Sequence, residues 1–282
     1  MEKPQDEKPI LVVGATGKTG RRVVQGLAAR GLAVRAGSRS GQPPFDWENQ
    51  ATWGPVLSGV EKVYLTYYPD LAMPGAVDQV PAFCGLALAG GVRRLLLLSG
   101  RGEEEARLCE QVVRDSGLEW TLLRSSWFCQ NFSEGYLLDW ILSGEVVLPA
   151  GTAPEPFIDA EDIAEVAVAA LTGDGHAGQL YEMTGRRLLT FAEAVEEIAR
   201  AAGRSIGYRE VSPQQYVAML EEQQVPAEYI WLLNYLFTTV LDGRNAHLTG
   251  GVQRALGREP RDFSEYARDT AATGVWDQVR VA

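Results

Sequence analysis

The feature that most constrains the fold is a glycine-rich loop that joins a predicted strand to a predicted helix. Residues 9–13 are a short run of apolar, mostly β-branched or leucine side chains after a proline, which predicts a buried parallel strand. The loop that follows is Gly14-Ala15-Thr16-Gly17-Lys18-Thr19-Gly20, and a helix is expected over 19–30 because one helical stripe carries Val23, Val24, Leu27 and Ala28. Gly31 stands where a helix commonly ends. This order of elements is typical of a dinucleotide-binding βαβ unit.

The loop has the spacing G-x-x-G-x-x-G, and each glycine has its own expected role. Gly14 permits a tight turn, Gly17 lets the backbone approach a pyrophosphate, and Gly20 lets the helix pack closely on the strand. The free N–H groups and the partial positive charge of the helix N-terminus favour phosphate binding. The other expected cofactor contacts in the loop are Thr16, Lys18 and Thr19. The alternative is a turn with a structural role only.

Strands and helices continue to alternate along the chain. Further strands are predicted over 32–37, near Phe45, and over 60–67, 92–99 and 118–124, and helices over 77–89 and 103–115. This alternation implies right-handed crossovers between parallel strands. The expected fold class is therefore α/β, with a doubly wound parallel Rossmann sheet.

Beyond Ser125 the pattern is less regular. A helix over 159–172, a strand over 179–184, a helix over 190–202 and two helices within 216–241 are predicted. We expect a Rossmann domain over residues 1–150, with its sheet completed by parts of 155–185. Residues 186–282 are expected to form a smaller, mainly helical substrate-binding lobe at the carboxyl edge of the sheet, where open α/β sheets bind ligands.

Charge excludes one class of partner and indicates another. The net charge of −11 opposes binding to the phosphate backbone of nucleic acids. The stretch from Ile10 to Phe45 departs from this balance, because it has no acidic residue and six basic ones: Lys18, Arg21, Arg22, Arg30, Arg35 and Arg39. A cationic window in an acidic chain suggests a local anion site, although a solvated helix face would explain part of it.

Three further features indicate the compartment and argue against a metal site. The cysteines (Cys84, Cys109 and Cys129) are odd in number and widely spaced, as expected for reduced, buried thiols of a cytosolic protein. The two histidines, His176 and His247, lack partners at ligand spacing, so no metal is expected. The polar first nine residues, and the lack of a run of roughly 20 apolar residues, favour a soluble cytoplasmic protein without membrane contact.

The end of the second predicted strand indicates which dinucleotide binds. NAD sites usually have an acidic residue there for the ribose 2′-hydroxyl, whereas this chain has Ser38-Arg39-Ser40. A guanidinium binds a 2′-phosphate through a charge-assisted fork, and a carboxylate would repel it. We therefore expect NADP(H) as the cofactor, with Arg39 as the principal ligand of the 2′-phosphate and Ser38 in support.

Several stretches together resemble one protein family. They are ILVVGATGKTG, VRAGSR, VRRLLLLSG, SGLEWTLLRSSWFCQNF and FIDAEDIAEVAVAAL, which lie between residues 10 and 171. In this ordered set the chain resembles the NmrA-like family of the atypical short-chain dehydrogenase/reductase superfamily. The resemblance implies an NAD(P)-binding Rossmann fold, an NADP-type cofactor and a site between the sheet and the C-terminal lobe. Members of the family include reductases of quinones, azo compounds and other small unsaturated molecules, and redox-sensing regulators.

The chain departs from the superfamily where acid–base chemistry is concerned. Typical members use a Tyr-x-x-x-Lys pair, but the corresponding segment 102–110 has neither residue, and Ala106 occupies the place of a lysine found in related reductases. The catalytic residues are therefore unknown. Three candidates stand at strand or helix ends: Ser99, Tyr67 and Glu103. Glu104 is an alternative to Glu103, and both glutamates are also explained as acids that stabilise a helix start.

The resemblance also implies contacts made after the strands. Thr66, Tyr67, Ser99 and Gly100 lie at the ends of two predicted strands and are expected to line the cofactor. The segment after the strand over 118–124 is expected to lie beside the nicotinamide, with Trp127, Phe128 and Asn131 binding substrate. Aromatic side chains there suit a flat, apolar ligand, but core packing explains them equally well.

Three functions follow from these observations. The first is an NADPH-dependent oxidoreductase that transfers hydride to a hydrophobic, aromatic or quinone-like small molecule, for which little acid catalysis is needed. The second is an NADP(H)-sensing regulator that acts through a protein partner without turnover. The third is a non-redox enzyme, such as a cyclase or isomerase, on the same fold. The apolar segment 229–237 suits a lobe core, a substrate lid or the face of a homodimer.

Overall fold

The computed structural model describes residues 8–277, and these form two compact units. The first unit runs to Ser125 and also contains Ala160–Met183 and Gly250–Arg258. The second unit contains Ser126–Asp159, Thr184–Thr249 and the residues from Glu259 onward. The chain therefore passes between the units several times.

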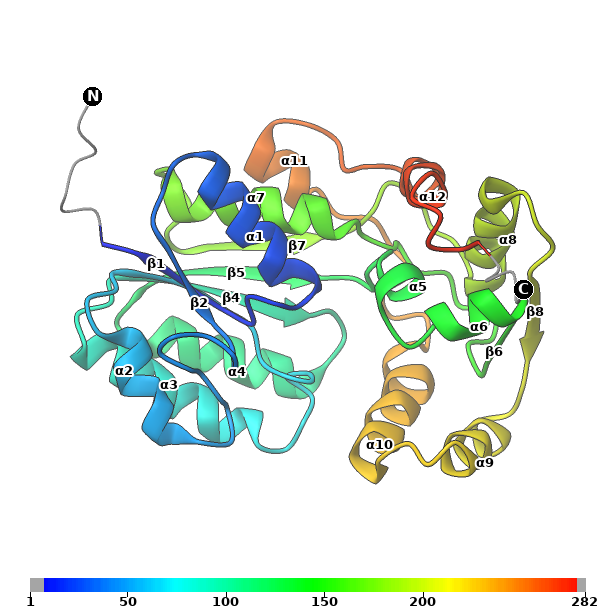
Figure 1. Ribbon diagram of the computed structural model, residues 1–282, viewed down its shortest axis with the longest axis horizontal. Helices are drawn as coiled ribbons and strands as arrows, with labels where there is room; N and C mark the ends of the chain where they lie inside the picture. Colours follow the sequence, from blue (N-terminus) through cyan, green and yellow to red (C-terminus); the bar gives the residue numbers. More distant parts are fainter. Residues whose placement is uncertain (1–7, 278–282) are drawn as a thin grey trace. The chain divides into compact units, whose positions relative to one another are not determined.

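The first unit is built on a six-stranded sheet in which every pair of neighbouring strands is parallel. The strand order is β2-β1-β3-β4-β5-β7 (Figure 1). The strands are β1 (Ile10–Val13), β2 (Val34–Gly37), β3 (Lys62–Leu65), β4 (Arg94–Gly100), β5 (Glu119–Ser125) and β7 (Gln179–Met183). Since the chain moves from β1 to one side for β2 and to the other side for β3, this is the doubly wound arrangement expected from the sequence.

Helices cover both faces of this sheet. On one face lie α1 (Lys18–Ala29), α7 (Ala160–Thr172) and α11 (Gly251–Leu256), and on the other α2 (Trp53–Leu57), α3 (Ala76–Ala89) and α4 (Glu104–Asp115), as Figure 1 shows. The short helix η1 (Gln50–Thr52) precedes α2. Successive side chains of a strand point to opposite faces, so Leu95 and Leu97 join the core under α2, α3 and α4. The four leucines of β4 are buried or partly buried, as expected of a central strand.

The strand predicted near Phe45 is wrong. Residues 41–49 form no strand, and β2 is the edge of the sheet. Phe45 instead packs against Trp47, with ring centroids 5.2 Å apart, and against Phe83 of α3 at 5.9 Å. Pro43 and Pro44 have no N–H groups to donate to a strand partner. Burial of the aromatic rings over α3 therefore replaces strand pairing here.

The second unit is mainly helical. Its helices are α5 (Asn131–Glu134), α6 (Leu138–Ser143), α8 (Phe191–Ala202), α9 (Pro213–Glu222), α10 (Ala227–Tyr235), the π-helical turn η2 (Leu236–Val240) and α12 (Phe263–Ala271). Two short parallel strands, β6 (Glu145–Leu148) and β8 (Gly207–Glu210), pair with each other. An aromatic core holds the unit together, with Phe132, Phe157, Phe191 and Phe263 in mutual contact.

The boundaries of the two units differ from the predicted division. Residues 126–150, expected in the Rossmann domain, lie in the second unit because β6 pairs with β8 and not with the large sheet. Residues 250–258, expected in the helical lobe, belong to the first unit, where α11 packs on α7 and β7. An ion pair of 2.7 Å between Arg258 and Asp162 fixes this return. All three cysteines are buried free thiols, as expected. In residues 8–277 no helix has both the length and the apolar character needed to cross a bilayer.

Candidate functional site

The glycine loop is held by contacts that leave no room for side chains at two of its positions. Gly14 has a φ of +74°, and its N–H donates to the carbonyl of Gly37 at 2.9 Å. A β-carbon on Gly14 would lie 2.2 Å from Oγ1 of Thr66, and one on Gly20 would lie 2.0 Å from the carbonyl oxygen of Gly14. The packing of the loop therefore requires glycine at positions 14 and 20, whether or not a ligand binds.

Gly17 is packed less tightly than these two glycines. Its φ of −76° suits any residue, and an added β-carbon would meet only the carbonyl oxygen of Gly14, at 3.3 Å. Gly17 is exposed and precedes α1, whose N-terminus has no side-chain cap. The first-turn N–H groups of a helix lack partners within the helix, so this end of α1 favours an anion. Beside Gly17, Thr16 is exposed, Lys18 is half-buried and Thr19 is buried.

The basic residues of the cationic window have different roles. Arg22 pairs with Glu161 at 2.6 Å, Arg30 donates to Thr172 at 2.8 Å, and Arg35 donates to the Val56 carbonyl at 2.8 Å. These three side chains therefore stabilise the fold. Arg39 is exposed, and it makes no side-chain hydrogen bond or ion pair with any residue that the structure describes.

Arg39 lies in a tight turn directly after β2. The N–H groups of Gly41 and Phe45 both donate to the carbonyl of Ser38 at 2.9 Å, which closes the turn. Because β2 and β1 are parallel neighbours, this turn and the glycine loop leave the sheet at the same edge. The structure thus brings Ser38 and Arg39 to the same edge as the N-terminus of α1.

The residues after β3 use their side chains within the protein. The hydroxyl of Thr66 donates to the carbonyl of Val13 at 3.1 Å and so ties β3 to β1. The hydroxyl of Tyr67 donates to Oε1 of Gln79 at 2.9 Å, and its ring packs on Trp47 with a centroid separation of 4.8 Å. Burial raises the pKa of Tyr67, and a higher pKa weakens it as a proton donor.

A network of hydrogen bonds and ion pairs occupies the ends of β4, β5 and β7. The hydroxyl of Ser99 donates to Glu110 of α4 at 2.7 Å, and Nε of Arg124 donates to the same oxygen at 2.8 Å. Arg124 also approaches Glu182, at 3.7 Å, and Glu182 accepts from Nε of Arg101 at 2.8 Å. Since the Ser99 proton is directed to Glu110, this hydroxyl does not serve as a donor to a ligand in this arrangement.

Glu103, the third catalytic candidate, is buried beside a second carboxyl group. It precedes α4 but makes no capping bond to the helix, and only 6% of its surface is exposed. Its side chain hydrogen-bonds that of Asp70, which follows β3. Burial raises the pKa of Glu103 well above its ordinary value, and the Asp70 charge raises it further. Glu104, the alternative, is exposed to solvent.

Asp70, Glu110 and Arg124 are residues of this edge that sequence reasoning missed. Asp70 follows a strand by several residues, and no motif marks it. A buried charge on a predicted strand, such as Arg124, is a signal that a partner must exist, but it does not say which of the many acidic residues that partner is.

The expected substrate-binding residues lie in the second unit. Trp127 is half-buried and packs against Phe191 at 5.2 Å and Phe237 at 5.1 Å. Phe128 is also half-buried, and its backbone forms an isolated β-bridge with Ile158. Asn131, half-buried as well, is the first residue of α5. Trp127 therefore contributes to the core of this unit and keeps part of its surface exposed.

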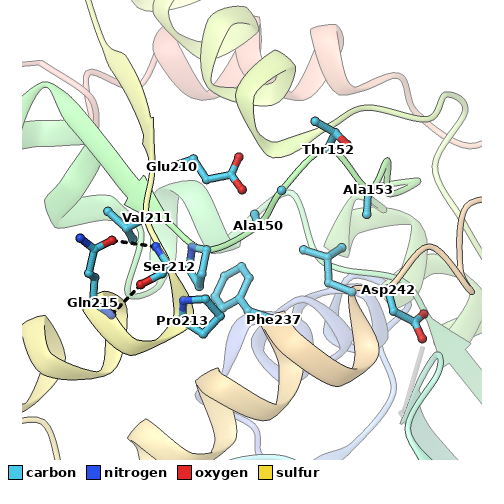
Figure 2. Close-up of a pocket in the computed structure, with 13 residues that line it drawn as sticks. Ala150, Thr152, Ala153, Glu210, Val211, Ser212, Pro213, Gln215, Phe237 and Asp242 are labelled. Carbon is cyan, nitrogen blue, oxygen red and sulfur yellow. Dashed lines mark hydrogen bonds between the residues drawn. The ribbon is translucent and has the colours of Figure 1, made fainter.

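The second unit also contains an open cavity of about 560 Å³. Figure 2 shows its lining, in which Ser212 and Gln215 form the capping box that begins α9. The lining residues are Pro149, Ala150, Gly151, Thr152, Ala153, Glu210, Val211, Ser212, Pro213, Gln215, Phe237, Leu241 and Asp242. The three expected substrate contacts are not among them, but Phe237 joins the cavity wall to Trp127.

The acidic segment before α7 serves the fold. Asp159 accepts a hydrogen bond from Gln130 at 2.7 Å, and Glu161 and Asp162 occupy the first turn of the helix. Across the described residues, no three histidine, cysteine or carboxylate side chains converge as a metal site would require.

The chain is similar to several known proteins over nearly its whole length. Prestalk A differentiation protein A of Dictyostelium discoideum is 30% identical over 93% of this chain and 92% of its own. The uncharacterized oxidoreductase YesF of Bacillus subtilis is 32% identical over 96% of this chain and 99% of its own. Agroclavine dehydrogenase of Claviceps fusiformis is 31% identical, with coverages of 95% and 98%. No protein-family model matches the chain.

Solved structures share the fold. The NADPH-dependent quinone oxidoreductase of Escherichia coli, in complex with NADPH, aligns with a TM-score of 0.75 at 22% identity, over 92% of this chain and 99% of that one. The triphenylmethane reductase of Citrobacter sp., in complex with NADP(H), gives 0.72 at 20% identity, over 93% and 99%. NmrA, described as a negative transcriptional regulator, gives 0.69 at 18% identity, over 95% and 98%. With its doubly wound sheet and its relatives at 30% identity or above, the chain belongs to the NmrA-like family of atypical short-chain dehydrogenases/reductases.

Proposed function

We propose that the chain is an NADPH-dependent oxidoreductase that delivers hydride to a hydrophobic, conjugated small molecule such as a quinone. The observation that carries the proposal is the pairing, at one sheet edge, of an uncapped helix N-terminus with the exposed Arg39. The first suits the pyrophosphate of a dinucleotide and the second suits a ribose 2′-phosphate. No acidic residue stands in the turn 38–41, where a carboxylate would favour NAD.

In this proposal each strand end contributes one part of the cofactor site. Gly17 and the first turn of α1 hold the pyrophosphate, with Thr16 and Lys18 beside it. Ser38 and Arg39 hold the 2′-phosphate on the β2 side. The remaining half of the dinucleotide then passes over the ends of β3 and β4, along the backbone of Thr66, Tyr67, Ser99 and Gly100. Bound NADPH supplies the hydride, while the chain orients the reactants and excludes water.

The names of similar proteins support a reductase of small conjugated molecules. Agroclavine dehydrogenase is a relative at 31% identity, and the fold neighbours include a quinone oxidoreductase and a triphenylmethane reductase. We propose that Trp127, Phe128 and Asn131 contact the substrate, because the two aromatic residues among them are half-buried and keep apolar surface accessible. A hydride acceptor that is conjugated stabilises its own developing charge, which suits a chain without the Tyr-x-x-x-Lys pair.

The second candidate is an NADP(H)-sensing regulator that acts through a protein partner. The hydroxyls of Ser99 and Tyr67 donate within the protein, which favours this candidate because neither is then free to donate to a substrate. A fold neighbour described as a transcriptional regulator is consistent with it. The raised pKa of the buried Glu103 supports the first candidate, since sensing does not need a carboxyl group that retains its proton.

The decisive experiment measures NADPH binding and NADPH oxidation separately. Binding is followed by isothermal titration, and oxidation by the loss of NADPH absorbance with a panel of quinones, azo dyes and enones. We expect tight binding and oxidation with at least one class of acceptor. Tight binding with no oxidation across the panel would favour the sensor, and no binding would overturn both candidates.

A further inference from the structure

Two carboxyl groups from distant parts of the chain meet at the carboxyl edge of the large sheet. Asp70 follows β3, Glu103 follows β4, and β3 and β4 are parallel neighbours. The two side chains are hydrogen-bonded to each other. Glu103 also lies against the end of β4, since a β-carbon on Gly100 would stand 2.0 Å from Glu103 Oε1.

The side chain of Glu103 is not explained by helix capping or by an ion pair. An acid at this position would ordinarily accept from the first-turn N–H groups of α4, but Glu103 makes no such bond. Its side chain is almost fully buried, with 6% of the residue exposed. Among the described residues, no donor group hydrogen-bonds to its Oε2 atom. A buried carboxylate in this setting would be costly, whereas a protonated carboxyl group bonded to Asp70 is not.

The charges around the pair favour the retention of a proton. The groups that act on Glu103 are Asp70, Glu105 and Glu110, and all three are acidic. Burial and these charges raise the pKa of Glu103, and burial raises the pKa of Asp70 even though it accepts from the N–H of Ala72 at 2.8 Å. Arg101, near Glu103 in sequence, already pairs with Glu182. Two carboxyl groups in contact titrate as one unit, and both pKa values are shifted in the direction that favours a shared proton.

The position of the pair matches the reactive half of the proposed cofactor. If the 2′-phosphate lies at Arg39 beyond β2 and the pyrophosphate lies at the end of β1, the other half of the dinucleotide must run toward β3 and β4. Glu103 and Asp70 stand after those two strands. Asp70 is half-buried, whereas Glu103 is almost fully buried, so the pair has one member near solvent and one near the sheet.

We propose that Glu103 is the proton donor for the reduced acceptor and that Asp70 returns the proton from water. This role rests on the proposed oxidoreductase function. Hydride addition to a C=O, C=C–C=O or N=N group moves an electron pair onto oxygen or nitrogen, and the Glu103 O–H bond then breaks to protonate that atom. The acceptor gains one hydride and one proton, the oxidised cofactor accounts for the two electrons, and the Glu103 carboxylate regains its proton from water through Asp70.

The test compares two kinds of acceptor. An enone or azo dye needs a proton after hydride transfer, whereas a cationic triphenylmethane dye becomes neutral by hydride addition alone. Glu103→Gln should lower kcat on the enone or azo dye by about 10²-fold or more, and should leave the rate on the cationic dye unchanged. In the wild type, kcat on the enone should fall as pH rises through the last ionisation of the pair, and the variant should lose this dependence. Asp115→Asn is the matched control, because it removes an exposed carboxylate at the far end of α4, the helix that follows Glu103.

A second readout needs no turnover. Infrared spectra of the cofactor-free chain at neutral pH should show a protonated carboxyl band that disappears in Glu103→Gln, changes its frequency in Asp70→Asn, where the hydrogen-bond partner differs, and is unchanged in Asp115→Asn. Absence of this band in the wild type would overturn the shared proton, and so would equal loss of rate on both kinds of acceptor. If the wild type oxidises NADPH with neither acceptor, the proposed function fails first, and the proton-donor role falls with it.

Discussion

Gly20 packs so closely on Gly14 that a β-carbon on Gly20 would lie 2.0 Å from the carbonyl oxygen of Gly14. This contact sets the angle at which α1 leaves the loop. Thr66 closes the other side, because its hydroxyl bonds to Val13 and occupies the space above Gly14. Contacts within the protein therefore fix both ends of the loop, whereas its middle glycine, Gly17, is exposed.

The first prediction separates the two kinds of glycine. Gly20→Ala should destabilise the fold by about 1–3 kcal/mol or more, because the new methyl group meets backbone that cannot move away. Gly17→Ala should lower the free energy of unfolding by much less than Gly20→Ala, because its new β-carbon would lie 3.3 Å from the Gly14 carbonyl oxygen, a contact that a shift of a few tenths of an ångström relieves. We expect Gly17→Ala to weaken NADPH binding by at least about tenfold, or 1.4 kcal/mol. Urea unfolding and isothermal titration measure the two effects. Unchanged NADPH affinity in Gly17→Ala would mean that the phosphates bind elsewhere.

The second prediction concerns the ion pair between Arg124 and Glu110. Glu110 is 2% exposed, so Arg124→Met would leave a buried carboxylate bonded only to the Ser99 hydroxyl. Removal of one partner from a buried pair costs about 3–5 kcal/mol. Arg124→Met should therefore lower the free energy of unfolding by an amount in this range, and adding Glu110→Gln should recover much of the loss. A loss as large in the double variant as in the single one would show that the pair is not the source of the effect.

The third prediction is the pH dependence of stability that Glu103 imposes. Its pKa in the folded chain lies well above the ordinary value of 4.5, so between these two values the folded protein binds more protons than the unfolded chain. The contribution of Glu103 to stability is therefore present below pH 4.5 and is lost as pH rises through the folded pKa. Glu103→Gln should unfold at a higher temperature than the wild type at alkaline pH, with a smaller difference at acid pH. A difference that does not vary with pH would contradict the raised pKa.

Local patterns predicted much of the fold. The strand, the glycine loop and α1 are neighbours in sequence, so hydrophobic period and glycine spacing were sufficient to define them. The leucines of β4 likewise indicated a strand buried on both faces. Arg39 was predicted as the ligand of the 2′-phosphate because it follows a strand in a stretch without acids; the structure leaves it exposed, and its role as a ligand stays a prediction.

Features that depend on contacts between distant segments were not predictable in the same way. Phe45 has the composition of a strand residue, but its packing on Phe83 depends on where α3 lies. The return of 250–258 to the first unit depends on Arg258 reaching Asp162. Asp70 and Glu103 come together only because β3 and β4 are adjacent in the sheet. In the sequence, Glu103 has the pattern of an ordinary acidic residue at the start of a helix.

Coenzyme titration of Arg39→Asp tests most directly whether the end of β2 selects NADP(H). Arg93→Asp serves as the control, because it makes the same charge change at an exposed position just before β4. Arg93 lies where the strands begin, whereas Arg39 lies where they end. We predict that Arg39→Asp loses NADPH affinity by about tenfold to a hundredfold and gains preference for NADH, while Arg93→Asp retains the wild-type preference. Unchanged NADPH affinity in Arg39→Asp, or equal losses in both variants, would contradict the account.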